Sequence, residues 1–247
     1  VSGPRGALRQ STALAGSRLR GLFRRAGLLD DTAYLKLLAK NINQVLQTPG
    51  RLVQSVAQAS FDAWVKYYRP DENTPNITVS YYAKGALVAL CLDLTLRAEG
   101  YTTLDNVMRA LWNRCSAGPM SEEDLAAVLQ ELGRRSFSQE IADWIHGTVE
   151  LPLERLLLKH GVAVVDEPAP LAQQLGVRVS ESNGTVLIKN VLRGGAAERA
   201  GFSPGDEWLA VAAAKGRKHQ DGATDYWRMS RLDDLPLYAG KRKSCTV

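Results

Sequence analysis

The stretch from Asn76 to Leu96 constrains the fold most, because it predicts one long helix that is apolar on nearly every side. Pro70 and Pro75 keep the preceding segment out of a helix, and Ser80 is placed to act as the N-cap. The leucines that follow are spaced too densely for a surface helix. We therefore expect a buried helix at the centre of a helical domain. Its first turn carries Tyr81, Tyr82 and Lys84.

The two tyrosines of this turn allow two interpretations. Aromatic residues in a first helical turn usually serve packing, and the residues alone favour that interpretation for Tyr81 and Tyr82. The functional alternative is that a phenol at a helix N-terminus lies in the positive field of the helix. Its O–H is then well placed to donate to a developing oxyanion.

A family resemblance changes this balance. The segment Ser-Phe-Asp-Ala-Trp-Val-Lys-Tyr-Tyr-Arg-Pro-Asp-Glu-Asn-Thr-Pro-Asn (60–76), followed by Val-Ser-Tyr-Tyr-Ala-Lys-Gly-Ala-Leu (79–87), resembles the M61 glycyl aminopeptidases. These are zinc metallopeptidases with a thermolysin-like catalytic domain and a C-terminal PDZ domain. Their Tyr-x-Lys-Gly pattern is shared with the M1 aminopeptidases, in which the tyrosine stabilises the tetrahedral intermediate. The resemblance spans residues 22–240 and implies that role for Tyr82.

The metal site of that family has no counterpart in this sequence. The family binds zinc through an HExxH helix and a downstream glutamate, whereas here the first histidine is His146 and the first glutamate is Glu72. A truncated gene, a frameshift and a degenerate paralogue all remain open as explanations. Zinc is therefore expected in the intact family but not in this chain. We expect the chain to be inactive on its own, and whether it is an enzyme stays open.

Other patterns that suggest catalytic or metal sites have simpler explanations. His146 and His160 fall near predicted helix C-termini, where a cation is mildly favoured, and His219 has no ligand-like spacing to either. The G-x-S-x-G match at 201–205 precedes a predicted strand instead of a helix, so it does not form a nucleophile elbow.

The fold class expected is α+β, with an all-α helical bundle followed by a small β domain. By resemblance, the bundle is the C-terminal half of a thermolysin-like catalytic domain, and the β domain is PDZ-like and incomplete. Capping residues indicate the helix ends. The predicted starts are Asp30 or Asp31, Pro49 after Thr48, Ser80, Ser121 and Ser138, and the predicted stops are Gly100, Gly133 and Gly147. The predicted domains are a basic N-terminal segment (1–21), the helical subdomain (22–161), a linker (162–170), the PDZ-like domain (171–240) and a basic tail (241–247).

The predicted PDZ-like domain has the clearest candidate for a binding site. The dipeptide Asn183-Gly184 predicts a β-hairpin, and residues 193–211 look like the PDZ core signature. The resemblance implies a carboxylate-binding loop at Leu175-Gly176-Val177 and a strand edge that pairs with an extended peptide. The implied peptide-binding residues are Leu175, Gly176, Val177 and Val179. An equally open alternative is a domain packed against its own helical neighbour without a ligand.

Charge and composition exclude some partners. The net charge of +5 comes from the ends, since residues 1–29 hold six arginines and no acid, and residues 241–243 are all basic. The remaining 22 basic and 26 acidic residues leave the body at about −4, which argues against a folded nucleic-acid surface. No apolar run is expected to reach the roughly 18–20 residues needed to cross a bilayer, and no signal peptide is recognisable.

Three widely separated cysteines favour a reducing, cytoplasmic location. Cys91, on the predicted buried helix, is expected to act as a small hydrophobic side chain. The partners expected are peptides or protein C-termini, without nucleic acid or membrane. Self-association through an exposed face of the helical bundle is also expected. The function predicted is that of a C-terminal portion of an M61-type zinc aminopeptidase, with a non-enzymatic peptide-binding or assembly module as the alternative.

Overall fold

The computed structural model describes residues 27, 30–116, 118–212 and 225–239. The chain forms two compact units: a helical unit (Val1–Pro70 and Asn76–Asp166) and a small unit (Asp71–Pro75 and Glu167–Val247). The predicted basic segments 1–21 and 241–247 lie outside the described residues, as do His219 and Cys245. Each unit has its own hydrophobic core.

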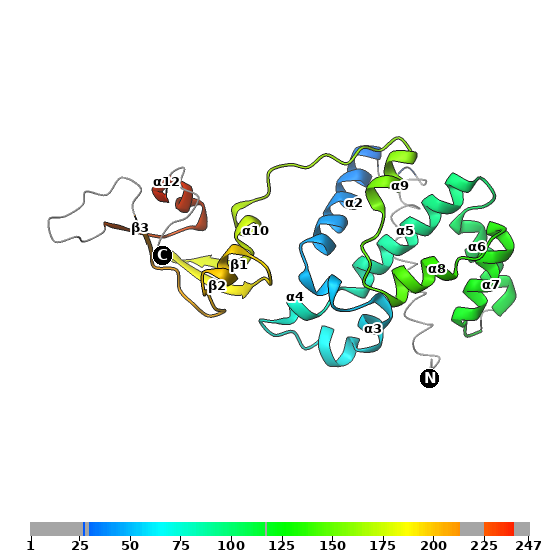
Figure 1. Ribbon diagram of the computed structural model, residues 1–247, viewed down its shortest axis with the longest axis horizontal. Helices are drawn as coiled ribbons and strands as arrows, with labels where there is room; N and C mark the ends of the chain where they lie inside the picture. The colour runs from blue at the N-terminus through cyan, green and yellow to red at the C-terminus, as the bar shows by residue number, and fades with distance from the viewer. Residues whose placement is uncertain (1–26, 28–29, 117, 213–224, 240–247) are drawn as a thin grey trace. The chain divides into compact units, whose positions relative to one another are not determined.

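The helical unit is built from a succession of short helices around one long one (Figure 1). Its described elements are α2 (Asp31–Leu46), the 3-10 turn η1 (Pro49–Leu52), α3 (Val56–Phe61), the π-helical turn η2 (Ala63–Tyr67), α5 (Tyr81–Glu99), α6 (Leu104–Cys115), α7 (Glu122–Gly133), α8 (Ser138–Ile141), the π-helical turn η3 (Ala142–His146) and α9 (Leu153–Lys159). The four-residue helix α4 (Thr74–Ile77) lies where the chain passes from one unit to the other.

Helix α5 is the core of the helical unit. It contacts α2, α3, α6, α9 and η3, and its side chains Leu87 and Leu92 are almost completely buried. The Ser80 hydroxyl accepts from the Ala83 N–H at 3.3 Å, and Gly100 ends the helix at φ +79°. The prediction of a buried helix capped by Ser80 and Gly100 is therefore confirmed.

One statement about this helix needs correction. Residues Thr74–Glu99 are long and apolar enough, by length and composition, to cross a membrane. The prediction that no apolar run is long enough to cross a bilayer is therefore wrong. Of the apolar window, 67% is buried inside the protein, as expected for the core helix of a folded unit.

Other predicted helix starts were correct where a side chain caps the first turn. The Asp30 carboxylate accepts from the Ala33 N–H at 2.7 Å, and Ser121 forms a capping box with Asp124. Pro49, in contrast, opens only the four-residue turn η1, and the following helix starts at a second capping box on Ser55. Ser138 is the first residue of α8, as predicted, and Phe137 is its N-cap.

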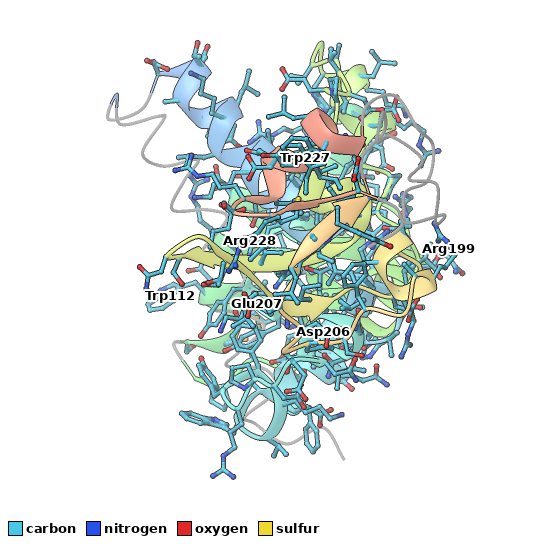
Figure 2. The ribbon with its side chains drawn as sticks, turned by 90° about the vertical axis from the view of Figure 1, so that its left-hand side faces the viewer. Trp112, Arg199, Asp206, Glu207, Trp227 and Arg228 are labelled. Atoms are coloured by element: carbon cyan, nitrogen blue, oxygen red, sulfur yellow. The ribbon has the colours of Figure 1, made fainter. Side chains whose placement is uncertain are left out.

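The described part of the small unit has two two-stranded antiparallel sheets and short helices. Its described elements are α10 (Leu171–Leu175), β1 (Val177–Ser182), β2 (Thr185–Val191), α11 (Ala196–Arg199), β3 (Ala210–Ala212), β4 (Tyr226–Arg228), η4 (Leu232–Asp234) and α12 (Leu235–Ala239). The turn between β1 and β2 has φ +50° at Asn183 and +74° at Gly184, which confirms the predicted hairpin. The second sheet pairs β3 with β4, whose Trp227 and Arg228 carry exposed side chains (Figure 2).

The described residues are thus mostly helical, with two small antiparallel sheets. This agrees with the predicted helical bundle followed by a small β part.

Candidate functional site

The two tyrosines in the first turn of α5 differ in their exposure to solvent. Tyr81 is buried, with 3% of its surface exposed, whereas Tyr82 is 41% exposed. Their ring centroids lie 4.1 Å apart at a tilt of 33°. The packing interpretation is therefore correct for Tyr81. Tyr82 keeps an accessible phenol at the N-terminal end of a buried helix, where the functional interpretation requires it.

An aromatic cluster holds this turn in place. The Tyr67 hydroxyl donates to the Ser80 hydroxyl at 3.2 Å, and the hydroxyls of Tyr68 and Tyr81 lie 3.3 Å apart. The Tyr67 ring meets that of Tyr81 edge-on at 5.7 Å. Burial raises the pKa of the Tyr81 phenol, and the neighbouring hydroxyls of Tyr68 and Tyr82 raise it further. The Tyr82 ring therefore packs on Tyr81, which Tyr67 and Tyr68 hold in place.

Lys84 has a structural role that the sequence did not reveal. It is 3% exposed, and its Nζ donates to the Arg51 carbonyl at 3.0 Å. Burial lowers the pKa of this ammonium group. Arg51 is itself tied to Glu150, with an Nη2–Oε1 distance of 2.8 Å. Lys84 thus ties η1 to α5, and its charge does not face solvent.

The described residues do not fit a zinc ion. Within residues 27, 30–116, 118–212 and 225–239, no three His, Cys, Asp or Glu side chains come together in an arrangement that could hold a metal. The Nε2 of His146 lies 2.8 Å from both carboxylate oxygens of Glu122, and the Nε2–H of His160 donates to the Leu94 carbonyl at 2.9 Å. Two of the three histidines are therefore engaged in interactions within the helical unit.

The predicted carboxylate-binding loop is tightly packed. Gly176 follows α10 at φ +74°, and its N–H donates to the Gln173 carbonyl at 3.2 Å. A Cβ on Gly176 would lie 2.8 Å from the Gly195 Cα, so the two backbones touch. Val177 is buried in the core of the small unit. Carboxylate binding at this loop stays a prediction, and its donors would have to be amides other than that of Gly176.

Among the described residues, β1 pairs with β2 alone, and the hairpin register shows which of its main-chain groups face the other edge. Glu181 pairs with Val186, and Val179 pairs with Ile188. The Val186 carbonyl and both main-chain groups of Ile188 bond to the segment that leads into β3, so they point away from β1. In an antiparallel pair of strands, two residues directly opposite each other either exchange both main-chain hydrogen bonds or exchange none. Val179 and Glu181, which lie opposite Ile188 and Val186, are therefore of the second kind. The main-chain groups of Val179 and Glu181 therefore face away from β2, while the Val179 side chain packs on the core.

Comparisons with known proteins find similarity to aminopeptidases. The family model for M61 glycyl aminopeptidases matches residues 20–88. Residues 20–88 are therefore similar to this family. The crystal structure of an aminopeptidase N family protein from Idiomarina loihiensis is similar, with a TM-score of 0.74 and 31% sequence identity. The alignment covers 81% of this chain and 37% of that one. Comparison with curated proteins gives no match.

The M61 match contains the whole first turn of α5, including the Tyr-Ala-Lys-Gly segment at 82–85. The predicted resemblance to M61 aminopeptidases is thus confirmed for residues 20–88, and this chain spans 37% of the length of the similar structure. The small unit lies outside the M61 match, apart from residues Asp71–Pro75.

Proposed function

We propose that this chain is the C-terminal portion of an M61-type zinc aminopeptidase and that its helical unit contributes Tyr82 as an oxyanion donor. The observation that carries the proposal is the exposed phenol on the first turn of α5, inside the residues that match the family. In peptide hydrolysis, negative charge develops on the carbonyl oxygen of the scissile bond. A donor fixed at a helix N-terminus stabilises that charge.

The neighbouring side chains support this assignment to Tyr82. Tyr81 lies beneath it and is buried, and the Lys84 ammonium is bound to the Arg51 carbonyl. Of the three polar side chains in this turn, Tyr82 is the exposed one. Zinc, when bound in such enzymes, activates water and polarises the carbonyl. The described residues do not fit that ion, so the step assigned to this chain is hydrogen-bond donation by Tyr82.

The chain by itself is expected to hydrolyse no peptide bonds. Glycyl-p-nitroanilide should show no turnover above buffer, with or without added zinc, and the purified chain should contain well below one zinc per molecule by elemental analysis. Circular dichroism on the same sample checks that the helical unit is folded. Stoichiometric zinc together with turnover would contradict the proposal.

A second candidate function, peptide binding by the small unit, rests on the edge of β1 that faces away from β2 and has no strand partner among the described residues. The outward main-chain groups of Val179 and Glu181 can pair with an extended peptide, as in strand addition to PDZ domains. The Leu232 N–H at the start of η4 donates to the Glu181 carboxylate at 2.7 Å, which holds η4 beside the far end of β1. The order of β1, β2, α11, β3, β4 and α12 is compatible with a PDZ-like arrangement.

This second function predicts binding that depends on a free C-terminus. An unstructured peptide with a C-terminal carboxylate should bind at least about tenfold more tightly than its C-terminal amide, because charge-assisted hydrogen bonds to the carboxylate are lost in the amide. Isothermal titration calorimetry with both peptides measures the ratio. Equal affinities, or no saturable binding, would favour a small unit without a peptide ligand.

A further inference from the structure

A row of exposed apolar side chains follows the end of α3 and the π-helical turn η2. Phe61, Trp64 and Val65 are largely exposed, and Tyr68, directly after η2, is about half exposed. Spacings of three and four residues place neighbouring side chains on one face of a helical segment. Ala63, in contrast, is completely buried in the core of the helical unit. We call the four exposed side chains the η2 surface.

Contacts between aromatic side chains connect the η2 surface to the Tyr82 phenol. The ring centroids of Trp64 and Tyr68 lie 5.0 Å apart. The Tyr68 hydroxyl lies 3.3 Å from the Tyr81 hydroxyl, and the Tyr81 ring packs on the Tyr82 ring with centroids 4.1 Å apart. Tyr81 is thus the one ring between Tyr68 and the proposed oxyanion donor.

The backbone of η2 also indicates a functional surface. A π-helical turn is a rare conformation that recurs at functional sites. The π-helical turn η3 buries its tryptophan, Trp144, whereas η2 exposes Trp64. Contiguous exposed apolar side chains commonly mark the place where a ligand or partner binds.

Charge and position favour a peptide as the ligand of the η2 surface. Lys66 on η2 pairs with Asp62 at an Nζ–Oδ2 distance of 2.6 Å, whereas anionic lipids and nucleic acids bind clusters of unpaired basic residues. Donation by Tyr82 to the scissile carbonyl places the substrate backbone close to this surface. An aminopeptidase substrate has one residue before that bond, so a surface of several side chains has to meet the residues after it.

We propose that the η2 surface binds a large apolar side chain of the peptide substrate, within the first two residues after the scissile bond. This inference rests on the proposed role of Tyr82, which places that bond. Phe61 and Trp64 determine the specificity, because their exposed rings can pack on an aromatic or long aliphatic side chain and remove it from water. The preferred substrates are then peptides with such a residue after the N-terminal one.

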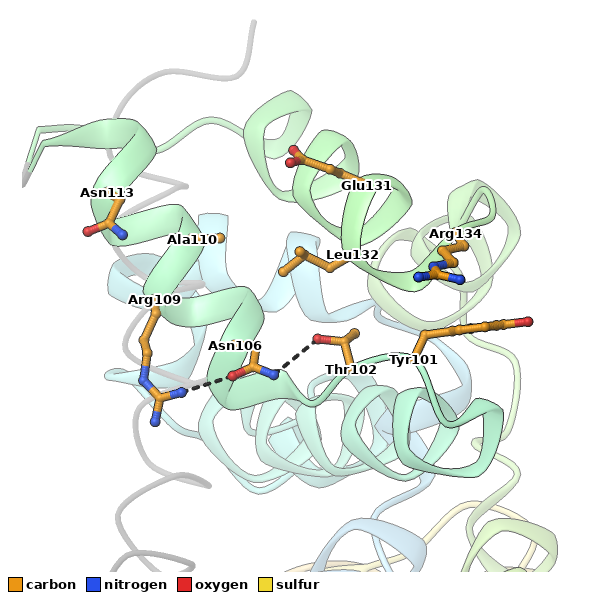
Figure 3. A pocket seen from close by; sticks show the side chains of 9 residues that line it. All are labelled: Tyr101, Thr102, Asn106, Arg109, Ala110, Asn113, Glu131, Leu132 and Arg134. Atoms are coloured by element: carbon orange, nitrogen blue, oxygen red, sulfur yellow. Dashed lines mark hydrogen bonds between the residues drawn. The ribbon is translucent and has the colours of Figure 1, made fainter.

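The pocket between α6 and α7 has a different character. It has a volume of about 450 Å³ and lies above the segment 101–102 that follows α5 (Figure 3). Arg109 and Arg134 lie at its opposite ends and point apart, and Glu131 lies away from both. Its charged side chains therefore do not converge on one ligand.

Calorimetry on the full chain with two peptide amides tests the proposal. Gly-Phe-Phe amide should bind at least about tenfold more tightly than Gly-Gly-Gly amide, because its rings leave water on the η2 surface. Both probes lack a C-terminal carboxylate, so carboxylate-dependent binding by the small unit does not contribute. Equal affinities, or no saturable binding of Gly-Phe-Phe amide, would overturn the proposal.

Trp64→Ala and Trp112→Ala locate the binding site. The two tryptophans are a matched pair, since both belong to the helical unit and are 68% and 67% exposed. Trp64→Ala should lower the affinity for Gly-Phe-Phe amide at least about tenfold, and Trp112→Ala should leave it unchanged. Phe61→Ala should lower it as well, without removing the contact between Trp64 and Tyr68. If Trp64→Ala and Trp112→Ala bind the probe equally well, the proposal fails.

A second copy of the chain is the competing occupant of the η2 surface, and sedimentation velocity detects it. Any self-association should be the same in the unmodified chain and in Trp64→Ala. A dimer that Trp64→Ala dissociates would make the η2 surface a dimer interface and would overturn the proposal. Failure of the Tyr82 assignment is a separate result, because it would appear as an unchanged kcat in an aligned enzyme variant and would not alter these affinities.

Discussion

Gly50→Ala is expected to destabilise the helical unit by about 3 kcal/mol or more, which is large for the addition of one methyl group. The Cβ of an alanine at this position would lie 2.1 Å from the Thr78 carbonyl oxygen and 2.5 Å from the Thr78 nitrogen. Both are main-chain atoms, so no side-chain rotation relieves the clash. Either η1 or the segment before α5 has to move.

Gly100→Ala provides the comparison in the same unit. Gly100 has φ +79° and open space around its Cα, so an alanine there meets backbone strain alone, about 1 kcal/mol. Urea denaturation followed by circular dichroism measures both variants. A loss at Gly50 no larger than that at Gly100 would show that η1 and Thr78 can separate at little cost.

The clash at Gly50 also bears on the proposed function. Thr78 lies two residues before the Ser80 cap, and the Val79 N–H donates to the Gln54 side chain at 3.3 Å. The Lys84–Arg51 contact joins the same two segments one helical turn further on. The turn η1 therefore positions the N-terminus of α5 and, with it, the Tyr82 phenol. Backbone movement at Gly50 would displace that phenol as well as weaken the fold.

The features that could be predicted from the sequence are those decided within a few residues. Ser80 and Ser121 cap helices because their hydroxyls reach an N–H three residues ahead, and Asn183-Gly184 turns the chain because both residues accept positive φ. The Tyr-x-Lys-Gly segment pointed to the same family whose model matches residues 20–88.

The features that could not be predicted depend on contacts between distant segments. Nothing near Lys84 in the sequence indicates that its ammonium is buried against the Arg51 carbonyl, 33 residues away. Which tyrosine of the pair faces solvent depends on the rotation of α5 against its neighbours. Pro49 carries an ordinary helix-start signal, but it opens only a 3-10 turn, and the backbone of its Gly50 packs closely against the distant Thr78. The pocket between α6 and α7 likewise needs three segments to assemble.

The second large effect concerns Tyr82, whose hydroxyl is expected to matter for catalysis and not for folding. In this chain, Tyr82→Phe should change the free energy of unfolding by no more than about 0.5 kcal/mol, because the ring is exposed and keeps its stacking on Tyr81. Tyr67→Phe is the contrasting variant, since it removes the donor to the Ser80 hydroxyl and should cost about 1 kcal/mol. Thermal and urea unfolding of the two variants measure the difference.

The catalytic half of this prediction needs a full-length M61 aminopeptidase that has a tyrosine aligned with Tyr82. Replacing that tyrosine with phenylalanine should lower kcat about 100- to 1000-fold with little change in KM, because an oxyanion donor acts in the transition state and not in the bound substrate. Phenylalanine at the position aligned with Tyr67 should lower stability and leave kcat within a few-fold. An unchanged kcat in the Tyr82-aligned variant would mean that the exposed phenol has no catalytic role. The similarity of this turn to M61 aminopeptidases would then reflect common ancestry and not a shared catalytic step.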